Sequence, residues 1–372
     1  LLAYNDNSGR FFNKEFDFAR GSSATYVAKD GLIKSAASDV PRIDFSDSTN
    51  GALLLEPTRS NLITYSEDFS QWANQNAGTG SAPIITSNNT ISPDGTQNAD
   101  KVVFNKGAGV STSDLSVIAS SGFTSQTNTA SFYIKADSPQ RIVIRNATNW
   151  QLVDVTTKWQ RISKTDTGTG IQIGLRDGYG IANIPNTATI YLWGAQAEQG
   201  SYATSYIPSL SGSATTRLAD VCNNSGSAQD FNSEEGVLYA EIAALADDGT
   251  NRIISLSDGS YDNSVRIQYY LTANVIEFRI VTGGVIQAIQ RPVITNVLQF
   301  NKIAISYKAN DFSFWVNGVK VATDTSGNTP IGLSELSFDD GNGSNDFYGK
   351  TKDLQVFTTA LTDEQLATLT TI

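Results

Sequence analysis

Residues 312–323 read FSFWVNGVKVAT, and this stretch decides the interpretation of the whole sequence. Phe312 and Phe314 occupy alternate positions, and a period of two predicts a strand with one buried face. Asn317-Gly318 follows, before a second run, VKVAT. Because Asn and Gly both accept the positive φ angles of a type I′ turn, the stretch predicts a tight antiparallel hairpin.

The same alternation of apolar and polar positions recurs along most of the chain. The clearest runs contain Phe132 and Ile134; Ile171, Ile173 and Leu175; Ile190 and Leu192; Ile276, Phe278 and Ile280; and Ile303, Ile305 and Tyr307. Short clusters of Gly, Asn, Asp, Ser and Thr separate them, as turns do between antiparallel strands. The sequence therefore predicts an all-β protein built from antiparallel β-sandwiches or jelly rolls.

A single short helix is predicted at the C-terminus. Thr362 and Gln365 have the spacing of a capping box, in which each side chain bonds the other residue's backbone amide. Leu361, Leu366 and Leu369 then give the segment an apolar side at helical spacing.

The length of 372 residues suits two domains. Residues 1–58 have little apolar density, so we expect an extended N-terminal lead-in there. Residues 59–210 are expected to form a first jelly-roll domain and residues 233–372 a second sandwich. The small, polar stretch 211–232 between them is expected to be a linker.

Composition excludes several classes of chemistry. The chain has no His, so it has neither a Ser-His-Asp triad nor an imidazole metal ligand. Cys222 is its one cysteine, which excludes a disulfide within the chain and a cysteine-based zinc site. The net charge of −11 repels phosphate backbones and anionic lipids, so we expect no nucleic-acid partner. We also expect no membrane insertion, because no stretch approaches the roughly 18 apolar residues that a spanning helix needs.

Catalysis finds little support in the remaining residues. A Glu-x-Asp-x-x-Glu run would place carboxylates on one face of a strand, as in some sandwich-fold glycosidases. The nearest run starts at Glu15 but ends in Arg20 and lies in the expected lead-in. We therefore expect no catalytic residues and no enzymatic activity.

Several longer phrases resemble known families. RIDFSDSTNGALLLEPTRSNLITYSEDFSQW (42–72), ISPDGTQNADKV (91–102) and YLWGAQAEQGSYATSYIPSLSGSATTRLAD (191–220) resemble a segment common in tailed-bacteriophage virion proteins. The order SEDFSQW, TTKWQRIS and YLWGAQAE is similar to jelly-roll carbohydrate-binding modules. FSFWVNGVKVAT and FYGKTKDLQVFTTALTDEQLATL (347–369) resemble the concanavalin A-like, laminin-G-like sandwich.

These resemblances imply a surface-exposed bacteriophage virion protein, a tail or head fibre or another appendage, that is made in the host cytoplasm. It would bind host-surface polysaccharide without catalysis and contact other virion proteins. The resemblance also implies a homo-oligomer, a trimer if the protein is a fibre. Two alternatives stay open: a purely structural decoration or assembly protein without a glycan site, and a polysaccharide-degrading enzyme or its binding module.

Sugar rings stack on flat side chains, so the five tryptophans are candidate ligand contacts. Trp150 follows polar, turn-like residues and is the first candidate for stacking. Trp315 has the opposite parity to the buried face of its strand, so it faces either a ligand or an interface. The remaining three occupy positions at which jelly rolls place core tryptophans: Trp72, Trp159 and Trp193.

Two loops offer further binding residues. Arg176, Asp177 and Tyr179 lie in a glycine-flanked turn, where the ring would project beside charged groups that can bond hydroxyls. Tyr261 and Asp262 form a similar turn in the second domain. An ordinary hairpin turn is the alternative interpretation of both loops.

Residues 340–346, DGNGSND, suggest a structural calcium ion. Asp340, Asn342, Ser344 and Asp346 place oxygen atoms at alternate positions, and Ca²⁺ prefers six to eight oxygen ligands. Both resembled folds commonly hold a structural calcium. A polar β-turn is the alternative interpretation.

Overall fold

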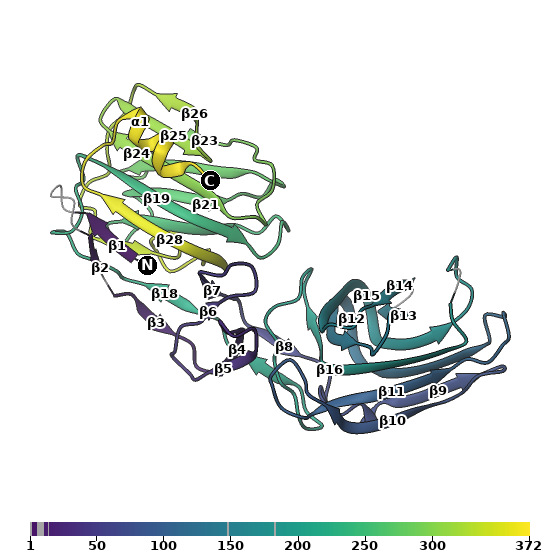
Figure 1. The fold of residues 1–372 in the computed structure, drawn as a ribbon. Helices are drawn as coiled ribbons and strands as arrows, with labels where there is room; N and C mark the ends of the chain where they lie inside the picture. The colour runs from purple at the N-terminus through teal and green to yellow at the C-terminus, as the bar shows by residue number, and fades with distance from the viewer. Residues whose placement is uncertain (1, 6–10, 14, 147–148, 182–183) are drawn as a thin grey trace. The chain divides into compact units, whose positions relative to one another are not determined.

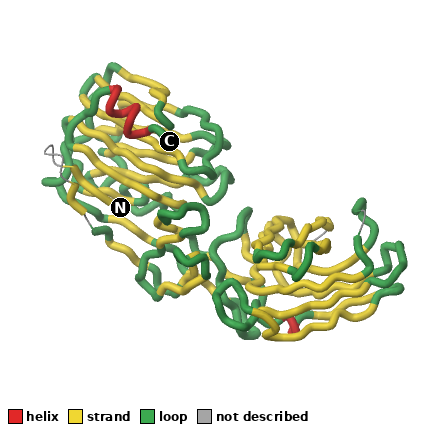
Figure 2. The backbone as a smooth tube through the Cα atoms, viewed as in Figure 1, coloured by secondary structure: helices red, strands yellow, loops and turns green. Residues whose placement is uncertain are grey.

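The computed structural model describes residues 2–5, 11–13, 15–146, 149–181 and 184–372 (Figures 1 and 2). Within them, strands predominate and the only α-helix is the short terminal one, so the predicted all-β fold is confirmed. The chain divides into two compact units, each built from several stretches of sequence. Unit 1 comprises residues 1–22, 36–57 and 219–372, and unit 2 comprises residues 23–35 and 58–218.

Unit 1 is a sandwich of two antiparallel-rich sheets. The nine-stranded sheet runs β2 (Phe11–Asn13), β1 (Leu2–Asn5), β28 (Gly349–Phe357), β19 (Glu235–Ala244), β24 (Asn301–Lys308), β25 (Asp311–Val316) and β26 (Val319–Asp324), with β7 (Ala52–Leu55) beside β28 and β6 (Ile43–Asp44) beside β7. The five-stranded sheet runs β23 (Val285–Gln290), β22 (Ile276–Thr282), β21 (Ser264–Tyr269), β20 (Arg252–Ser257) and β27 (Glu335–Ser337). Apolar side chains from both sheets form one core.

The predicted hairpin at Asn317-Gly318 joins β25 to β26. Asn317 and Gly318 both have positive φ, 50° and 82°, as the turn requires. Phe312 and Phe314 are fully buried in the core between the sheets. Trp315 points to the opposite face, where it is buried with the helix residue Leu366.

The helix α1 (Asp363–Thr370) begins with the predicted capping box. Thr362 Oγ1 accepts a hydrogen bond from the Gln365 amide at 3.3 Å, and Gln365 Oε1 accepts one from the Thr362 amide at 2.9 Å. The helix covers the outer face of the nine-stranded sheet over β24 and β25 (Figure 1). In the described part of the chain, no helix is long and apolar enough to cross a membrane.

Unit 2 is built around one strongly bent sheet. Its order is β10 (Ser81–Thr90), β11 (Ala99–Asn105), β16 (Thr187–Gln199), β12 (Leu115–Lys135), β15 (Gln160–Arg176), β13 (Gln140–Asn146) and β14 (Asn149–Val155), with β9 (Ala73–Ala77) also beside β12. A 3₁₀ turn, η1 (Phe69–Gln71), precedes β9.

The bend lies in the long central pair β12 and β15. Their register breaks between Ser121 and Gln126, and Gly122 has a φ of 105°. A Cβ atom at Gly170 would lie 2.6 Å from the Ser120 carbonyl oxygen, so a side chain would separate the strands there. Beyond the break, β12 pairs with β16, and before it with β9. Apolar residues from both parts of the sheet pack in one core.

Short strand pairs involve the expected lead-in and the expected linker. Residues 1–58 contribute strands to both units, and residues 211–232 contribute β17 (Thr215–Arg217) and β18 (Val221–Asn223). β17 pairs with β8 (Arg59–Asn61), β18 with β3 (Asp17–Ala19), and β4 (Ala24–Val27) with β5 (Ile33–Ala36). Apolar side chains of these segments also reach the cores: Leu55 and Cys222 lie in the core of unit 1, and Phe18 packs against it. They are too widely spaced along the sequence to give a periodic pattern.

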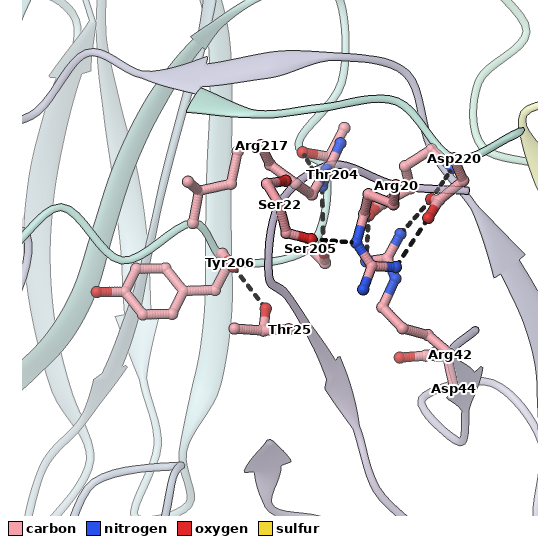
Figure 3. Close-up of polar contacts among 12 residues, drawn as sticks. Arg20, Ser22, Thr25, Arg42, Asp44, Thr204, Ser205, Tyr206, Arg217 and Asp220 are labelled. Atoms are coloured by element: carbon pink, nitrogen blue, oxygen red, sulfur yellow. Dashed lines mark hydrogen bonds and ion pairs between the residues drawn. The ribbon is translucent and has the colours of Figure 1, made fainter. Parts of the chain in front are cut away.

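Asp220 organises the polar part of unit 1 (Figure 3). Its two carboxylate oxygens accept hydrogen bonds from Arg20 Nη1 at 3.0 Å and Arg42 Nη2 at 2.5 Å. The Glu56 amide also donates to Asp220, at 2.8 Å, and the Glu56 side chain pairs with Arg42 Nη1 at 2.7 Å. The side chains of Arg20, Arg42, Glu56 and Asp220 are all almost completely buried. Because water cannot solvate them, their charges are stabilised by one another.

We expect the substitution Asp220→Ala to destabilise unit 1 by about 3–5 kcal/mol, the usual result of breaking a buried ion pair. The cause is that two buried guanidinium groups lose a shared carboxylate. Chemical denaturation followed by tryptophan fluorescence measures the loss. The exposed Asp311 provides a matched control, Asp311→Ala, and equal stability of the two variants would contradict the prediction.

Candidate functional site

Three of the predicted binding residues lie together in unit 2. Trp150 lies on β14, directly opposite Arg145 of β13. The Trp150 ring lies 6.4 Å, centroid to centroid, from the ring of Tyr179, at an angle of 34°. Trp150 is half-buried and packs partly on the unit 2 core, whereas 58% of Tyr179 is exposed. The two rings thus form a partly exposed aromatic surface.

Two arginines contact this surface. The Arg176 guanidinium carbon lies 5.4 Å from the centroid of Trp150 and 5.0 Å from that of Tyr179. Arg145 lies 5.8 Å from the Trp150 centroid. All three distances fit cation–π contacts. We call the four residues Trp150, Tyr179, Arg176 and Arg145 the aromatic platform.

The Tyr179 loop has an unusual backbone. Tyr179 has a φ of 58° and lies between Gly178 and Gly180, whose φ angles are 89° and 76°. Left-handed φ is rare for a bulky residue and costs on the order of 1–3 kcal/mol. Two hydrogen bonds of Arg176 offset part of this free-energy cost. Its Nη2 donates to the Tyr179 hydroxyl at 3.2 Å, and its Nε donates to the Thr112 carbonyl at 3.1 Å.

Asp177 forms an ion pair with Lys106. The Lys106 side chain is only 2% exposed, and its Nζ also donates to the Gly109 carbonyl at 3.0 Å and to Asn186 Oδ1 at 3.2 Å. Asp177 therefore anchors the loop that carries Tyr179. Lys106 and Arg145 carry no local sequence signal, because only the fold brings them near residues 176–179.

The two predicted residues of the second loop, Tyr261 and Asp262, lie in unit 1. Tyr261 covers the buried guanidinium of Arg266, which lies 3.4 Å from the ring centroid. Its hydroxyl accepts a hydrogen bond from Arg279 Nη1 at 2.5 Å. Burial lowers the pKa of Arg266. Asp262 is exposed, and its backbone oxygen accepts a hydrogen bond from Gly284.

The other tryptophans are mostly committed to packing. Trp72 and Trp193 are buried, as predicted. Trp159 is partly buried beside Trp193, and its Nε1 donates to the Ile91 carbonyl at 3.1 Å. Trp315 is 4% exposed, and its Nε1 donates to Ser313 Oγ. Trp150 is thus the tryptophan that offers a ring beside an exposed aromatic partner.

The predicted calcium loop is closed by its own hydrogen bonds. Asp340 Oδ1 accepts from the amides of Asn342 and Ser344, at 3.1 and 3.2 Å, and its Oδ2 accepts from Asn345. Asp346 accepts from the Tyr348 hydroxyl. Across the described residues, no group of three or more Asp, Glu, Cys or His side chains is arranged to hold a metal ion. Calcium binding stays a prediction.

A depression of about 660 Å³ lies on unit 2. Its lining consists of Pro139, Gln140, Arg141, Asp154, Val155, Thr156, Ile184 and Pro185. Asp154 supplies its one carboxylate, which accepts a hydrogen bond from Arg141 Nε at 2.8 Å. Glycoside hydrolysis uses two carboxyl groups, and this depression offers one that is already paired.

Unit 2 also contains a half-buried acid, Glu67. Its Oε1 accepts a hydrogen bond from the Tyr206 hydroxyl and its Oε2 accepts one from Asn98 Nδ2, both at 2.8 Å. Burial raises the pKa of Glu67, and the nearby Asp94 raises it further. The protonated form is therefore favoured more in the folded state than in the unfolded chain.

We expect the stability of unit 2 to fall as the pH rises through the raised pKa of Glu67. The folded state binds the proton more tightly, so the stabilisation is complete at low pH and is lost as the group ionises. Glu67→Gln should reduce this slope, because the amide stays neutral. Urea midpoints between pH 4 and pH 8 measure it. Asp154→Asn, at an exposed site, is the control, and an unchanged slope in Glu67→Gln would contradict the prediction.

Comparisons with known proteins bear mainly on the fold. Residues 238–367 match the model of the concanavalin A-like lectin/glucanases superfamily (Laminin_G_3), which confirms the expected laminin-G-like sandwich in the C-terminal part. A search of curated proteins finds no match.

Solved structures with similar folds include three from different settings. The CBM40 module of the Ruminococcus gnavus IT-sialidase, solved with alpha2,3 sialyllactose, is 16% identical at a TM-score of 0.33, covering 40% of this chain and 93% of the module. A heptameric pentraxin from Limulus polyphemus is 16% identical (TM-score 0.30; 36% and 69% covered). Domains LG4-5 of mouse laminin alpha1 are 10% identical (TM-score 0.26; 78% and 95% covered). These likenesses concern the fold alone.

Proposed function

We propose that this chain is a non-catalytic carbohydrate-binding protein and that the aromatic platform of unit 2 holds the glycan. One observation carries the proposal: an exposed tyrosine, held in a left-handed conformation, lies beside a half-buried tryptophan, with a guanidinium against both rings. The C–H face of a sugar ring can stack on such rings, while neighbouring N–H groups bond its hydroxyls. The lectin superfamily match elsewhere in the chain supports the same class of function.

The setting we propose is the surface of a bacteriophage particle, where the protein serves as a fibre or another appendage that binds host-surface polysaccharide. Support comes from the resemblance of residues 42–72 and 191–220 to virion proteins and from a chain that needs no disulfide. A homo-oligomer suits this role, because several weak sites on one particle bind together more strongly than one.

A purely structural role is the second candidate. Trp150 packs partly on the core and both rings already contact Arg176, so protein contacts account for part of the platform. On this view, the rings only fix the loop that carries Tyr179. The two functions differ in whether substitutions at the platform change glycan retention.

We expect Trp150→Ala to weaken glycan retention by about tenfold or more, because stacking and shape complementarity are lost together. A glycan array identifies the ligand, and affinity electrophoresis in that glycan measures the loss. The control Ile84→Ala, at an exposed position of the same unit, should bind the glycan as strongly as the unsubstituted protein does. If the original chain retains no glycan, the structural role is favoured instead.

Tyr179→Asn should separate binding from folding. Asn tolerates left-handed φ better than Tyr, which offsets the loss of the ring contact, worth about 0.5–1.5 kcal/mol. The free energy of unfolding should therefore change by no more than about 1 kcal/mol, while glycan retention falls. Denaturation and affinity electrophoresis on the same sample measure both. Unchanged retention would show that the exposed ring takes no part in binding.

A further inference from the structure

Three cations of unit 2 differ in their partners. Lys106 and Arg141 each form an ion pair with a carboxylate, that of Asp177 and that of Asp154. Arg176 instead donates to two uncharged oxygens, the Thr112 carbonyl and the Tyr179 hydroxyl. Within the described ranges it forms no ion pair. The guanidinium that touches both rings thus forms no ion pair with a carboxylate of the described chain.

This arrangement is unexpected for so acidic a chain. The sequence contains 37 acidic and 26 basic residues, so carboxylates are in excess. Arg176 nevertheless lies where a sugar would stack, and the Arg145 guanidinium lies on the same Trp150 ring. A guanidinium has five N–H donors, and the two hydrogen bonds of Arg176 leave donors for a ligand.

We propose that the glycan bound at the platform is acidic, a polysaccharide that carries carboxylate groups such as those of uronic acids. Its ring stacks on Trp150 and Tyr179, and its carboxylate pairs with Arg176. Arginine suits this role because its planar fork binds a carboxylate through two parallel hydrogen bonds. The proposal rests on the glycan-binding function above and adds the charge of the ligand.

The acidic surface of the rest of the chain makes this pairing selective. With a net charge of −11, most of the surface repels a polyanion. Binding then depends on the local pairing at Arg176, and it should weaken as salt screens the charges.

The test is affinity electrophoresis of the full chain in gels that contain polygalacturonate or hyaluronan. A second set of gels contains the same polymers after chemical reduction of their carboxyl groups. A third gel contains dextran sulfate, which carries sulfate groups in place of carboxylates. We expect retention by a carboxylated polymer, at least about tenfold weaker retention by its reduced form, and weaker retention at high salt. Arg176→Gln should lose the preference for the carboxylated form, and Arg176→Lys should restore it only in part, because a lysine lacks the planar fork.

Lys101→Gln is the control, because it removes one positive charge from β11 of the same unit, away from the platform. It should leave retention within about twofold. If the carboxylated and the reduced polymers are retained equally, the ligand is not recognised by its carboxylates. If dextran sulfate is retained as strongly as the carboxylated polymers, the same conclusion follows. Either result contradicts the proposed acidic ligand but not the glycan-binding function. Retention of no polymer, together with an empty glycan array, overturns both.

Discussion

The structure of unit 1 depends on one buried carboxylate, that of Asp220. It accepts hydrogen bonds from the guanidiniums of Arg20 and Arg42 and from a backbone amide, and Glu56 supplies the second negative charge of the cluster. Two cations and two anions balance, which makes their burial tolerable. Because these residues come from three distant parts of the sequence, the cluster joins the N-terminal segments to the C-terminal sandwich in one unit.

Unit 2 uses the same kind of polar closure around Glu198. Both oxygens of this buried carboxylate accept hydrogen bonds from Thr204, and the Thr204 hydroxyl also accepts one from Arg217. Burial raises the pKa of Glu198. The side chain of Asn61 adds hydrogen bonds to the carbonyls of Ala195 and Ile207. Each unit therefore contains buried polar groups that bond one another.

The aromatic platform contrasts with these closed clusters. In the clusters the buried carboxylates of Asp220 and Glu198 accept hydrogen bonds from buried neighbours, as burial demands. At the platform, Tyr179 is exposed on a left-handed backbone and Arg176 bonds only neutral oxygens. A position that costs stability and leaves a charge unneutralised is more easily explained by a ligand than by folding. The Lys106–Asp177 pair beneath holds the loop in place, so that this cost does not unfold it.

The fold class, the hairpin at Asn317-Gly318 and the capped terminal helix could all be predicted from the sequence, because each depends on local periodicity or local hydrogen bonds. The sequence also predicted Trp150, Arg176 and Tyr179 as binding residues, because Trp150 follows a polar turn and Tyr179 lies between two glycines. That these residues meet could not be predicted, since Trp150 and Tyr179 lie on different elements that strand pairing brings together. The tertiary structure alone also revealed the buried charge clusters, because an arginine in a polar stretch has the same local pattern whether it is exposed or pairs with a carboxylate 200 residues away.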